Sequence, residues 1–126
     1  MKRIKTDVLV IGGGSGGLSV AAGASQMGAS VTLLEGHAMG GDCLNFGCVP
    51  SKALIASGKA AYSQSHALQY GVADHKPKVD YAAIKDHVAD VIATIAPLDS
   101  VERFEGLGVN VIEEYGEFIS PTEVKA

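Results

Sequence analysis

Residues 8–17 read VLVIGGGSGG: four apolar residues, then five glycines and one serine. A continuous apolar run that ends at glycine is typical of a strand buried on both faces of a parallel sheet, and we expect this strand within residues 4–11. The alanine-rich stretch from Ser15 to about Met27 predicts a helix that ends at Gly28, and residues 30–35 predict a second strand. This is the order of a βαβ unit, so we predict an α/β fold with a parallel sheet.

The glycines of this stretch have the G-x-G-x-x-G spacing of dinucleotide-binding loops. Gly12 would make the tight turn, Gly14 would let a diphosphate approach the backbone, and Gly17 would let helix and strand pack closely. Ser15 and Gly16 lie at the predicted helix start, where free N–H groups can receive the diphosphate. A glycine-rich stretch alone can be a flexible turn, but this one follows a predicted strand and opens a predicted helix. We therefore predict that it binds a dinucleotide.

Glu35 ends the second predicted strand. Its distance from the loop is close to the 20-residue separation at which an acid meets the ribose 2′-OH of a dinucleotide. Taken alone, Glu35 would be interpreted as a solvated carboxylate at a strand end. After a matching glycine loop, it favours FAD or NAD(H) over NADP, because a carboxylate repels a 2′-phosphate. The loop does not distinguish FAD from NAD(H).

The middle of the chain predicts two long helices. Residues 50–69 carry helix formers, and Gly71 is placed to end this helix. A second helix is predicted to begin after Asp80, which suits an N-cap, to turn at Pro97 and to resume through Phe104. Its apolar residues follow helical spacing and are Ile84, Val88, Val91, Ile92 and Ile95.

Residues 109–112 predict a third strand, and ISPTEVKA at residues 119–126 is typical of a turn that enters another strand. Three parallel strands with two long helices form a small sheet with an unfinished edge. We therefore expect residues 1–126 to be the N-terminal piece of a longer protein.

The composition bounds the class of protein. A chain of 126 residues with 47% hydrophobic content can bury one core, and we expect one domain. The net charge of −4 and the absence of a basic patch argue against nucleic acid as a partner. No apolar stretch approaches the roughly 18–20 residues of a membrane span. The apolar run 8–11 is too short for the core of a secretion signal, so we expect a cytoplasmic protein without a membrane partner.

The chain's two cysteines lie in GGDCLNFGCVPSK, residues 40–52. A zinc site needs four ligands, and the histidines do not have finger-like spacing; they are His37, His66, His75 and His87. We expect no metal and place these histidines on the surface or on helices. Inert buried cysteines are the second alternative, and a redox pair is the third. Four intervening residues can bring Cys43 and Cys48 into disulfide range, and both a helix start and Lys52 would favour a Cys48 thiolate.

Together, VLVIGGGSGG and GGDCLNFGCVPSK resemble the flavin-dependent pyridine nucleotide–disulfide oxidoreductases, in the family's order and spacing. The resemblance implies a Rossmann-like FAD-binding domain with a parallel sheet, incomplete at its C-terminal end, and FAD as cofactor. It implies that Cys43 is the interchange thiol that meets substrate. Cys48 would lie beside the flavin and form a charge-transfer complex with it, with Lys52 near flavin N5.

The same resemblance places further residues on the cofactor. Gly41 and Asp42 would lie along the FAD phosphates and the flavin, and the backbone of Gly116 would contact the adenine end. Asp42 stands where the family usually has threonine. An aspartate adds a negative charge near the diphosphate, so its contact would involve a backbone N–H or a metal ion.

CVPSK, residues 48–52, resembles dihydrolipoamide dehydrogenases and mercuric reductases more than glutathione reductases. The implied function is electron transfer between NAD(P)H, FAD and the Cys43–Cys48 disulfide, and then a small or protein-bound disulfide substrate, most simply lipoamide. Alternatives are a mercuric reductase-like enzyme and a non-catalytic FAD-binding module. The nicotinamide and dimerisation domains of the family have no counterpart in residues 1–126. We therefore expect a homodimer for the full-length enzyme and no turnover by these residues alone.

Overall fold

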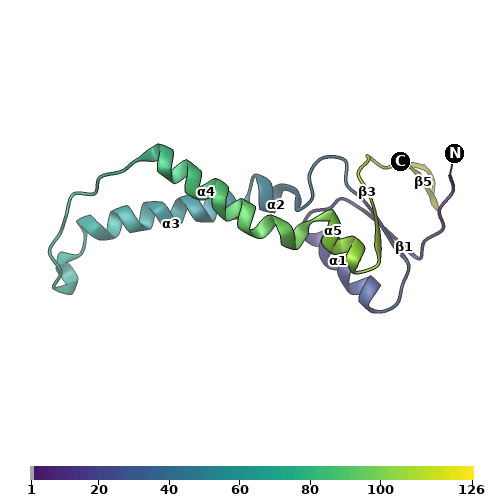
Figure 1. Cartoon of the computed structure of the whole chain (residues 1–126), viewed down its shortest axis with the longest axis horizontal. Helices are drawn as coiled ribbons and strands as arrows, with labels where there is room; N and C mark the ends of the chain where they lie inside the picture. Colours follow the sequence, from purple (N-terminus) through teal and green to yellow (C-terminus); the bar gives the residue numbers. More distant parts are fainter. Residues whose placement is uncertain (1) are drawn as a thin grey trace.

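Strand β1 (Val8–Ile11), helix α1 (Ser15–Gln26) and strand β2 (Val31–Leu34) form the predicted βαβ unit in the computed structural model, which describes residues 2–126. β1 lies parallel to β2, with Val8 opposite Val31 and Ile11 opposite Leu34. Strand β3 (Val109–Ile112) lies parallel to β2 on its other side, which gives the sheet order β1-β2-β3. The predicted α/β fold with a parallel sheet and a third strand at these residues is confirmed (Figure 1).

The core lies on the face of the sheet that α1 and helix α5 (Val101–Gly106) cover. Alternate residues of each strand point to this face, as the two-residue period of a strand requires. Leu33 at the centre of β2 and Phe104 of α5 are its largest buried side chains. The other core residues are Val10, Leu18, Ala21, Val31 and Val109.

The opposite face of the sheet is only partly covered. All four residues of β2 are buried, whereas in β1 only Val10 is, and Leu9 and Ile11 are 38% and 46% exposed. The prediction that β1 is buried on both faces is therefore wrong for this chain, because among residues 2–126 no second layer covers the outer side of β1. The strand also begins at Val8 rather than near residue 4; Thr6 and Asp7 instead hydrogen-bond to Ser30.

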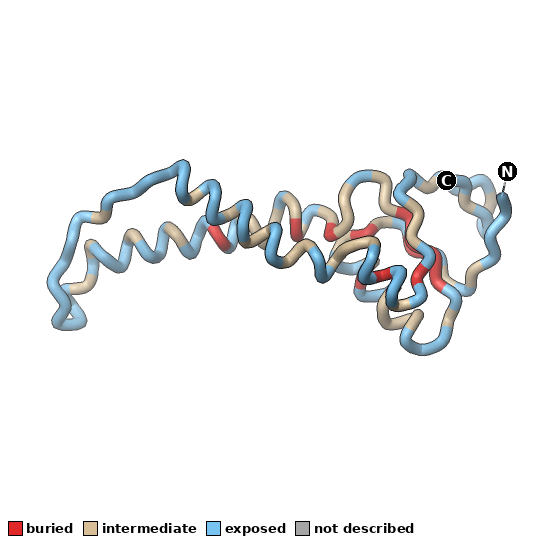
Figure 2. The backbone as a smooth tube through the Cα atoms, viewed as in Figure 1, coloured by how far each residue is buried: buried red, intermediate tan, exposed pale blue. Residues whose placement is uncertain are grey.

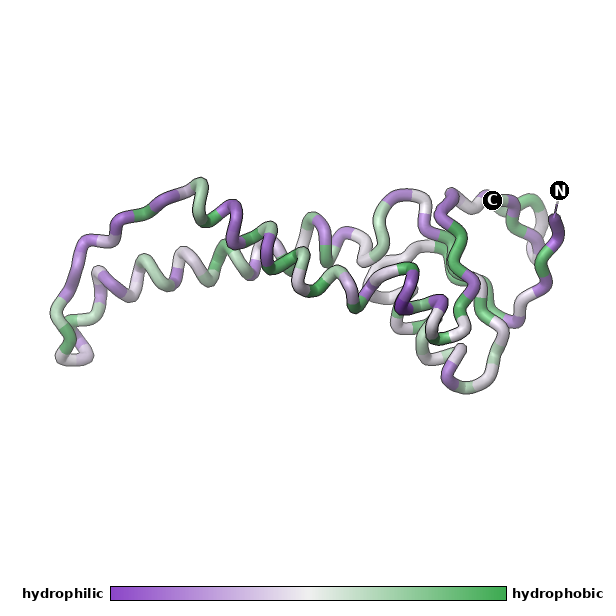
Figure 3. Tube along the Cα trace, in the orientation of Figure 1, coloured by the Kyte–Doolittle hydropathy of each residue, from purple (hydrophilic) through white to green (hydrophobic). Residues whose placement is uncertain are grey.

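A two-helix arm extends from this body (Figure 1). We call residues 2–40 and 96–126 the body, and residues 48–95 the arm. The arm contains helix α3 (Cys48–Ser65), the short helix η1 (Leu68–Tyr70) and helix α4 (Tyr81–Ile95). The one-turn helix α2 (Gly41–Asn45) joins it to the body. Ala53 is the only arm residue that is buried, and hydrophobic residues are spread along both helices with hydrophilic ones between them (Figures 2 and 3).

The predicted boundaries of the first arm helix are shifted. α3 begins at Cys48 instead of Pro50. Proline is tolerated anywhere in the first turn of a helix, because an N–H at these positions would have no partner within the helix. α3 ends at Ser65 because the carboxylate of Asp74 accepts the N–H groups of Ala67 and Leu68, at 2.6 and 2.8 Å, and turns the chain. From Gly71, with φ +77°, an exposed connection without helix or strand leads to α4.

The second arm helix is predicted well. Asp80 caps α4 by accepting the Ala83 N–H at 3.2 Å. The chain turns through helix η2 (Ala96–Asp99), which contains Pro97, and resumes as α5. The predicted apolar stripe is half-buried at every position, and α4 packs along α3.

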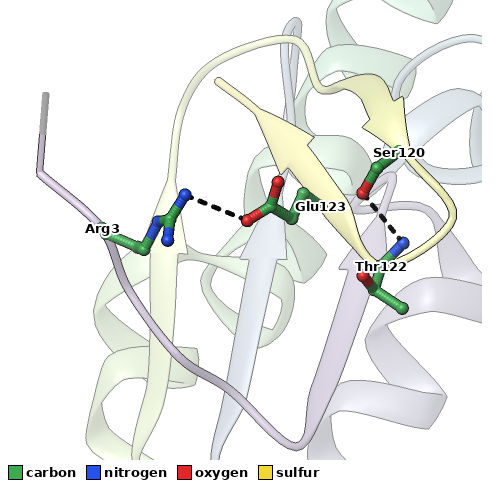
Figure 4. A network of polar contacts seen from close by, with 4 residues as sticks. All are labelled: Arg3, Ser120, Thr122 and Glu123. Carbon is green, nitrogen blue, oxygen red and sulfur yellow. Dashed lines mark hydrogen bonds and ion pairs between the residues drawn. The ribbon is translucent and has the colours of Figure 1, made fainter.

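The C-terminal residues form an antiparallel hairpin of strand β4 (Glu117–Ser120) and strand β5 (Glu123–Lys125). The turn and the last strand were predicted, whereas β4 was not. The Ser120 hydroxyl accepts the Thr122 N–H at 3.3 Å within the turn, and Arg3 forms an ion pair with Glu123 at 3.1 Å (Figure 4). Both side chains of the pair are exposed, so it contributes little stability.

Across residues 2–126, no helix has the length and apolar character to cross a membrane.

Candidate functional site

The glycine loop between β1 and α1 is a tight turn. Gly12 has φ +106°, a conformation that favours glycine, and its N–H donates to the Leu34 carbonyl at 2.8 Å. A Cβ on Gly17 would overlap the Gly12 carbonyl oxygen, so α1 approaches β1 too closely for any side chain there. Like every helix start, that of α1 leaves the N–H groups of Ser15 and Gly16 without a helical partner. This geometry can receive a diphosphate.

A second glycine segment, Gly40 and Gly41, packs directly on this loop. The Gly40 N–H donates to the Gly13 carbonyl at 2.8 Å, and Gly14 and Gly40 form a parallel β-bridge. A Cβ on Gly41 would lie 2.7 Å from the Cα of Gly14. The two segments, 26 residues apart, therefore present one backbone surface, which we call the glycine surface (residues 12–17 and 40–41). Gly13 and Gly40 are both buried, and the sequence reasoning missed them; the repeated glycine pair at residues 40–41 was the available signal.

Glu35 lies directly after β2 and is not a solvated carboxylate. Its Oε2 accepts the Gly13 N–H at 2.6 Å. Its Oε1 accepts the N–H groups of His37 and Ala38, at 2.8 and 3.2 Å. Its side chain is half-buried. The acid that the sequence pairs with the glycine loop is thus brought against that loop.

The two cysteines lie at the junction of body and arm. Cys43 is half-buried in α2, and Cys48 is the exposed first residue of α3; both are free thiols. A Cβ on Gly47 would lie 2.9 Å from the Asp42 carbonyl oxygen, so the turn between the thiols needs a glycine. Asn45 holds the same turn, since its side-chain amide donates to the carbonyls of Met39 and Gly41, at 3.1 and 2.9 Å. Sequence reasoning named neither Gly47 nor Asn45.

The two thiols influence each other. A hydrogen bond between the side chains raises the pKa of Cys43, and desolvation and the proximity of Cys48 raise it further. The Lys52 ammonium, one turn along α3, acts in the opposite direction and lowers the pKa of Cys43. Cys48 thus favours the protonated thiol of Cys43, whereas Lys52 favours its thiolate. Both forms take part in thiol–disulfide exchange, so the arrangement suits that reaction.

This combination of site and fold has a counterpart among known proteins. The model of the pyridine nucleotide-disulphide oxidoreductase family matches residues 6–121. The chain belongs to this family. Family membership implies a flavin cofactor, with NAD(P)H as the usual partner.

Curated members of the family include similar dihydrolipoyl dehydrogenases. The enzyme of Halobacterium salinarum is 42% identical over 122 residues, which cover 95% of this chain and 25% of that protein. The enzyme of Bacillus subtilis is 34% identical over 122 residues, which cover 97% and 26%. The chain thus spans about a quarter of the length of these relatives.

One solved structure shows the same fold. The HOCl-induced flavoprotein disulfide reductase RclA from Escherichia coli, as its Cu(II) complex, matches with a TM-score of 0.72 and 21% identity. The match covers 93% of this chain and 24% of that one. At this identity the likeness shows the fold alone, which is the Rossmann-like fold of a flavoprotein disulfide reductase.

Two further residues that the sequence predicts at the cofactor are Gly116 and Asp42. Gly116 precedes the hairpin, where a Cβ would lie 2.6 Å from Leu34 at the end of β2. A Cβ on Gly36 would overlap the ring of Tyr115, the residue before Gly116. Gly36 and Tyr115 are therefore in close contact beside the end of β2. Asp42 follows Gly41 and is exposed, and within residues 2–126 its carboxylate has no hydrogen-bond partner.

None of the histidines joins the thiols in a metal site. Within the part of the chain that the structure describes, no three metal-ligating side chains gather. His37 stacks on Phe46 beside α2, with ring centroids 5.9 Å apart. His66 stacks on Tyr62 near the tip of the arm, at 3.7 Å.

Proposed function

We propose that residues 1–126 form the N-terminal part of the FAD-binding domain of a flavin-dependent disulfide oxidoreductase, with a lipoamide-like disulfide as substrate. The observation that carries this proposal is the contact between the two glycine segments. The Gly14–Gly40 bridge joins a diphosphate-type loop to the segment that runs straight into Cys43 and Cys48. A cofactor on the loop would therefore have a redox-capable thiol pair beside it.

The residues present fit FAD, because the loop backbone is open at Gly14 and Gly16: a Cβ on Gly16 would meet no atom within 4 Å, and one on Gly14 would meet only the Gly41 Cα, at 4.0 Å. The loop residues would bind the diphosphate through their backbone; they are Gly12, Gly14, Ser15, Gly16 and Gly17. Glu35 would accept hydrogen bonds from a ribose, and the Gly116 backbone would face the adenine end. Gly41 and Asp42 would continue along the phosphates toward the flavin, and Lys52 would stand near its N5.

The thiol chemistry follows from the pair's geometry. The Cys43 thiolate would attack a sulfur of the substrate disulfide and release the other sulfur as a thiol after protonation. Cys48 would then attack the resulting mixed disulfide, which releases the second substrate thiol and leaves a Cys43–Cys48 disulfide. Bound FAD, once reduced by NAD(P)H, would supply the two electrons that restore the dithiol, and in a lipoamide enzyme the flow runs in reverse.

The substrate class rests on the relatives. Dihydrolipoyl dehydrogenases are 34–42% identical to this chain over 122 residues. Because the chain spans about a quarter of their length, NAD(P)H as electron donor and a homodimer are proposals for the full-length protein, whose nicotinamide and dimerisation domains would lie outside residues 1–126. Cysteines that cycle between dithiol and disulfide suit a reducing compartment, so the cytoplasm is the proposed location.

The test uses the purified chain and FAD. We expect a yellow complex that, after reduction by two electrons, shows a long-wavelength absorbance band. Cys48→Ser should abolish the band. Cys43→Ser has no disulfide to reduce and a free Cys48 thiol, so it should show the band with oxidised FAD before any reduction; both variants should bind FAD like the parent. A chain that binds no FAD would contradict the proposal. Bound FAD without the band would leave a non-catalytic binding module, and NAD(P)H-dependent turnover by the chain alone would contradict the proposed division into domains.

A further inference from the structure

The backbone of Glu35 is held by the sheet, independently of its side-chain contacts. Its own N–H donates to the Ile112 carbonyl at 3.0 Å and so continues the pairing of β2 with β3 by one residue. The Cβ of Glu35 therefore starts from a fixed point at the carboxyl end of the central strand. This is the edge of a parallel sheet at which ligands bind in open α/β folds.

The carboxylate joins two separate loops. One oxygen accepts the Gly13 N–H of the loop after β1, and the other accepts the N–H groups of His37 and Ala38 in the loop after β2. Charge-assisted hydrogen bonds of this kind are among the strong ones in proteins. Both carboxylate oxygens are thus engaged within the chain itself.

Packing around Gly13 supports the same connection independently. A Cβ on Gly13 would lie 3.1 Å from the Cβ of Glu35 and 3.0 Å from the Met39 sulfur, so the loop rests directly on the Glu35 side chain. The Gly13 carbonyl accepts from Gly40, so this residue is held through its N–H by Glu35 and through its C=O by the second glycine segment. Gly13 is buried as a result.

We propose that Glu35 is a positioning residue that holds the glycine loop in its binding conformation before any nucleotide arrives. This role is separate from a contact with ribose and deepens the proposed function, on which its nucleotide-binding part rests. Because the orientation of Gly13 determines where Gly14 and the start of α1 point, loss of the carboxylate bridge weakens the binding of the diphosphate itself.

Amide hydrogen exchange of the ligand-free chain tests the bridge. The amides of Gly13, His37 and Ala38 are expected to exchange at least about tenfold more slowly than that of Ser15, which has no helical partner. In Glu35→Gln, exchange at Gly13 should rise at least about tenfold, because one amide oxygen cannot serve both loops. The matched control Glu105→Gln, on the exposed surface of α5, should leave it unchanged. Fast exchange at Gly13 in the parent chain would overturn the proposal.

Two nucleotides separate positioning from ribose binding. ADP and 2′,3′-dideoxy-ADP carry the same diphosphate, but the second lacks the ribose hydroxyls. Glu35→Gln is expected to weaken both by about tenfold or more, even though removal of a negative charge alone would strengthen the binding of a diphosphate. Weakened ADP binding with unchanged dideoxy-ADP binding would overturn the proposal and leave Glu35 as a ribose acceptor only.

A second variant keeps the test decisive if Glu35→Gln does not fold. Glu35→Asp retains the charge on a side chain one methylene shorter, which suits the local bond to His37 but not the reach to Gly13. Exchange should then rise at Gly13 and stay slow at His37; slow exchange at both would overturn the bridge. If neither nucleotide binds to the parent chain, the proposed FAD site fails, whereas the exchange data still decide the role of Glu35.

Discussion

The body and the arm of this molecule are stabilised in different ways. Every buried residue lies in the body except Leu44 in α2 and Ala53 in α3 (Figure 2). The arm has long helices, but they meet along a narrow line of half-buried side chains. The body therefore derives its stability from a core, while the arm depends more on helix propensity, capping and one thin contact. The comparison also locates the site, because the glycine surface belongs to the body and the thiols lie where the arm begins.

The largest expected effect is the difference in unfolding free energy lost when a leucine is truncated to alanine in the core and in the arm. Leu33→Ala should lower the free energy of unfolding by about 2–5 kcal/mol, because Leu33 is fully buried in the body. Leu54→Ala in α3, where the side chain is 44% exposed, should cost about 1 kcal/mol or less. Urea unfolding followed by circular dichroism measures both. Equal losses would refute the distinction between body and arm.

The next effect compares two glycines. Gly17→Ala places a Cβ on the Gly12 carbonyl, so we expect a loss of about 1–3 kcal/mol in unfolding free energy and loss of FAD binding. Gly58→Ala in the interior of α3 meets no atom within 4 Å and should stabilise the chain by about 0.5–1 kcal/mol. Thermal melts and flavin fluorescence provide the measurements. A neutral Gly17→Ala would show that the close packing of α1 on β1 is not required.

A smaller effect should be confined to the arm. Asp80→Ala removes the N-cap of α4 and should cost about 1 kcal/mol. Amide exchange should rise in the first turn of α4 and remain unchanged at Leu33. Asp80→Asn, which keeps an N-capping oxygen, serves as the control and should behave like the parent chain. Increased exchange throughout the body would mean that arm and body unfold as one unit.

The smallest effect lies at the junction and concerns the pKa of Cys43. Cys48→Ala removes the hydrogen bond that raises it, so the pKa should fall, and alkylation by iodoacetamide should begin at lower pH because the thiolate is the reactive form. In the Cys48→Ala background, Lys52→Met should move the profile back to higher pH. Mass spectrometry of the Cys43 peptide reports both shifts. If the pH dependence of Cys43 alkylation is the same in the parent chain and in Cys48→Ala, the coupling of the thiols is contradicted.

The predictable features of this molecule are those encoded in short continuous stretches. The βαβ unit, the loop at Gly12–Gly17 and the Asp80 cap each depend on a few neighbouring residues, so local rules suffice. The match of Glu35 to the loop was predictable because its separation is a property of the βαβ unit. The sequence also placed the two cysteines close together in the chain.

Features that depend on distant contacts were not predictable. The bridge between Gly14 and Gly40 joins segments 26 residues apart, and no periodic pattern encodes it. The exposure of Leu9 and Ile11 depends on what covers the sheet, whereas their apolar character alone indicated burial. The end of α3 depends on Asp74, which lies nine residues beyond the last helical residue, Ser65. Its carboxylate accepts N–H groups of residues that follow the helix.

The exposed connection between η1 and α4 has a consequence for limited proteolysis. Without helix or strand from Gly71 to Asp80, it is an internal segment that is open to a protease. A single cut there would not divide the molecule along its architecture, because β1, α1 and β2 precede the cut while α5 and β3 follow it. Leu33 from one piece and Phe104 from the other share one core, so the nicked protein would persist as two complementary halves held together by that core.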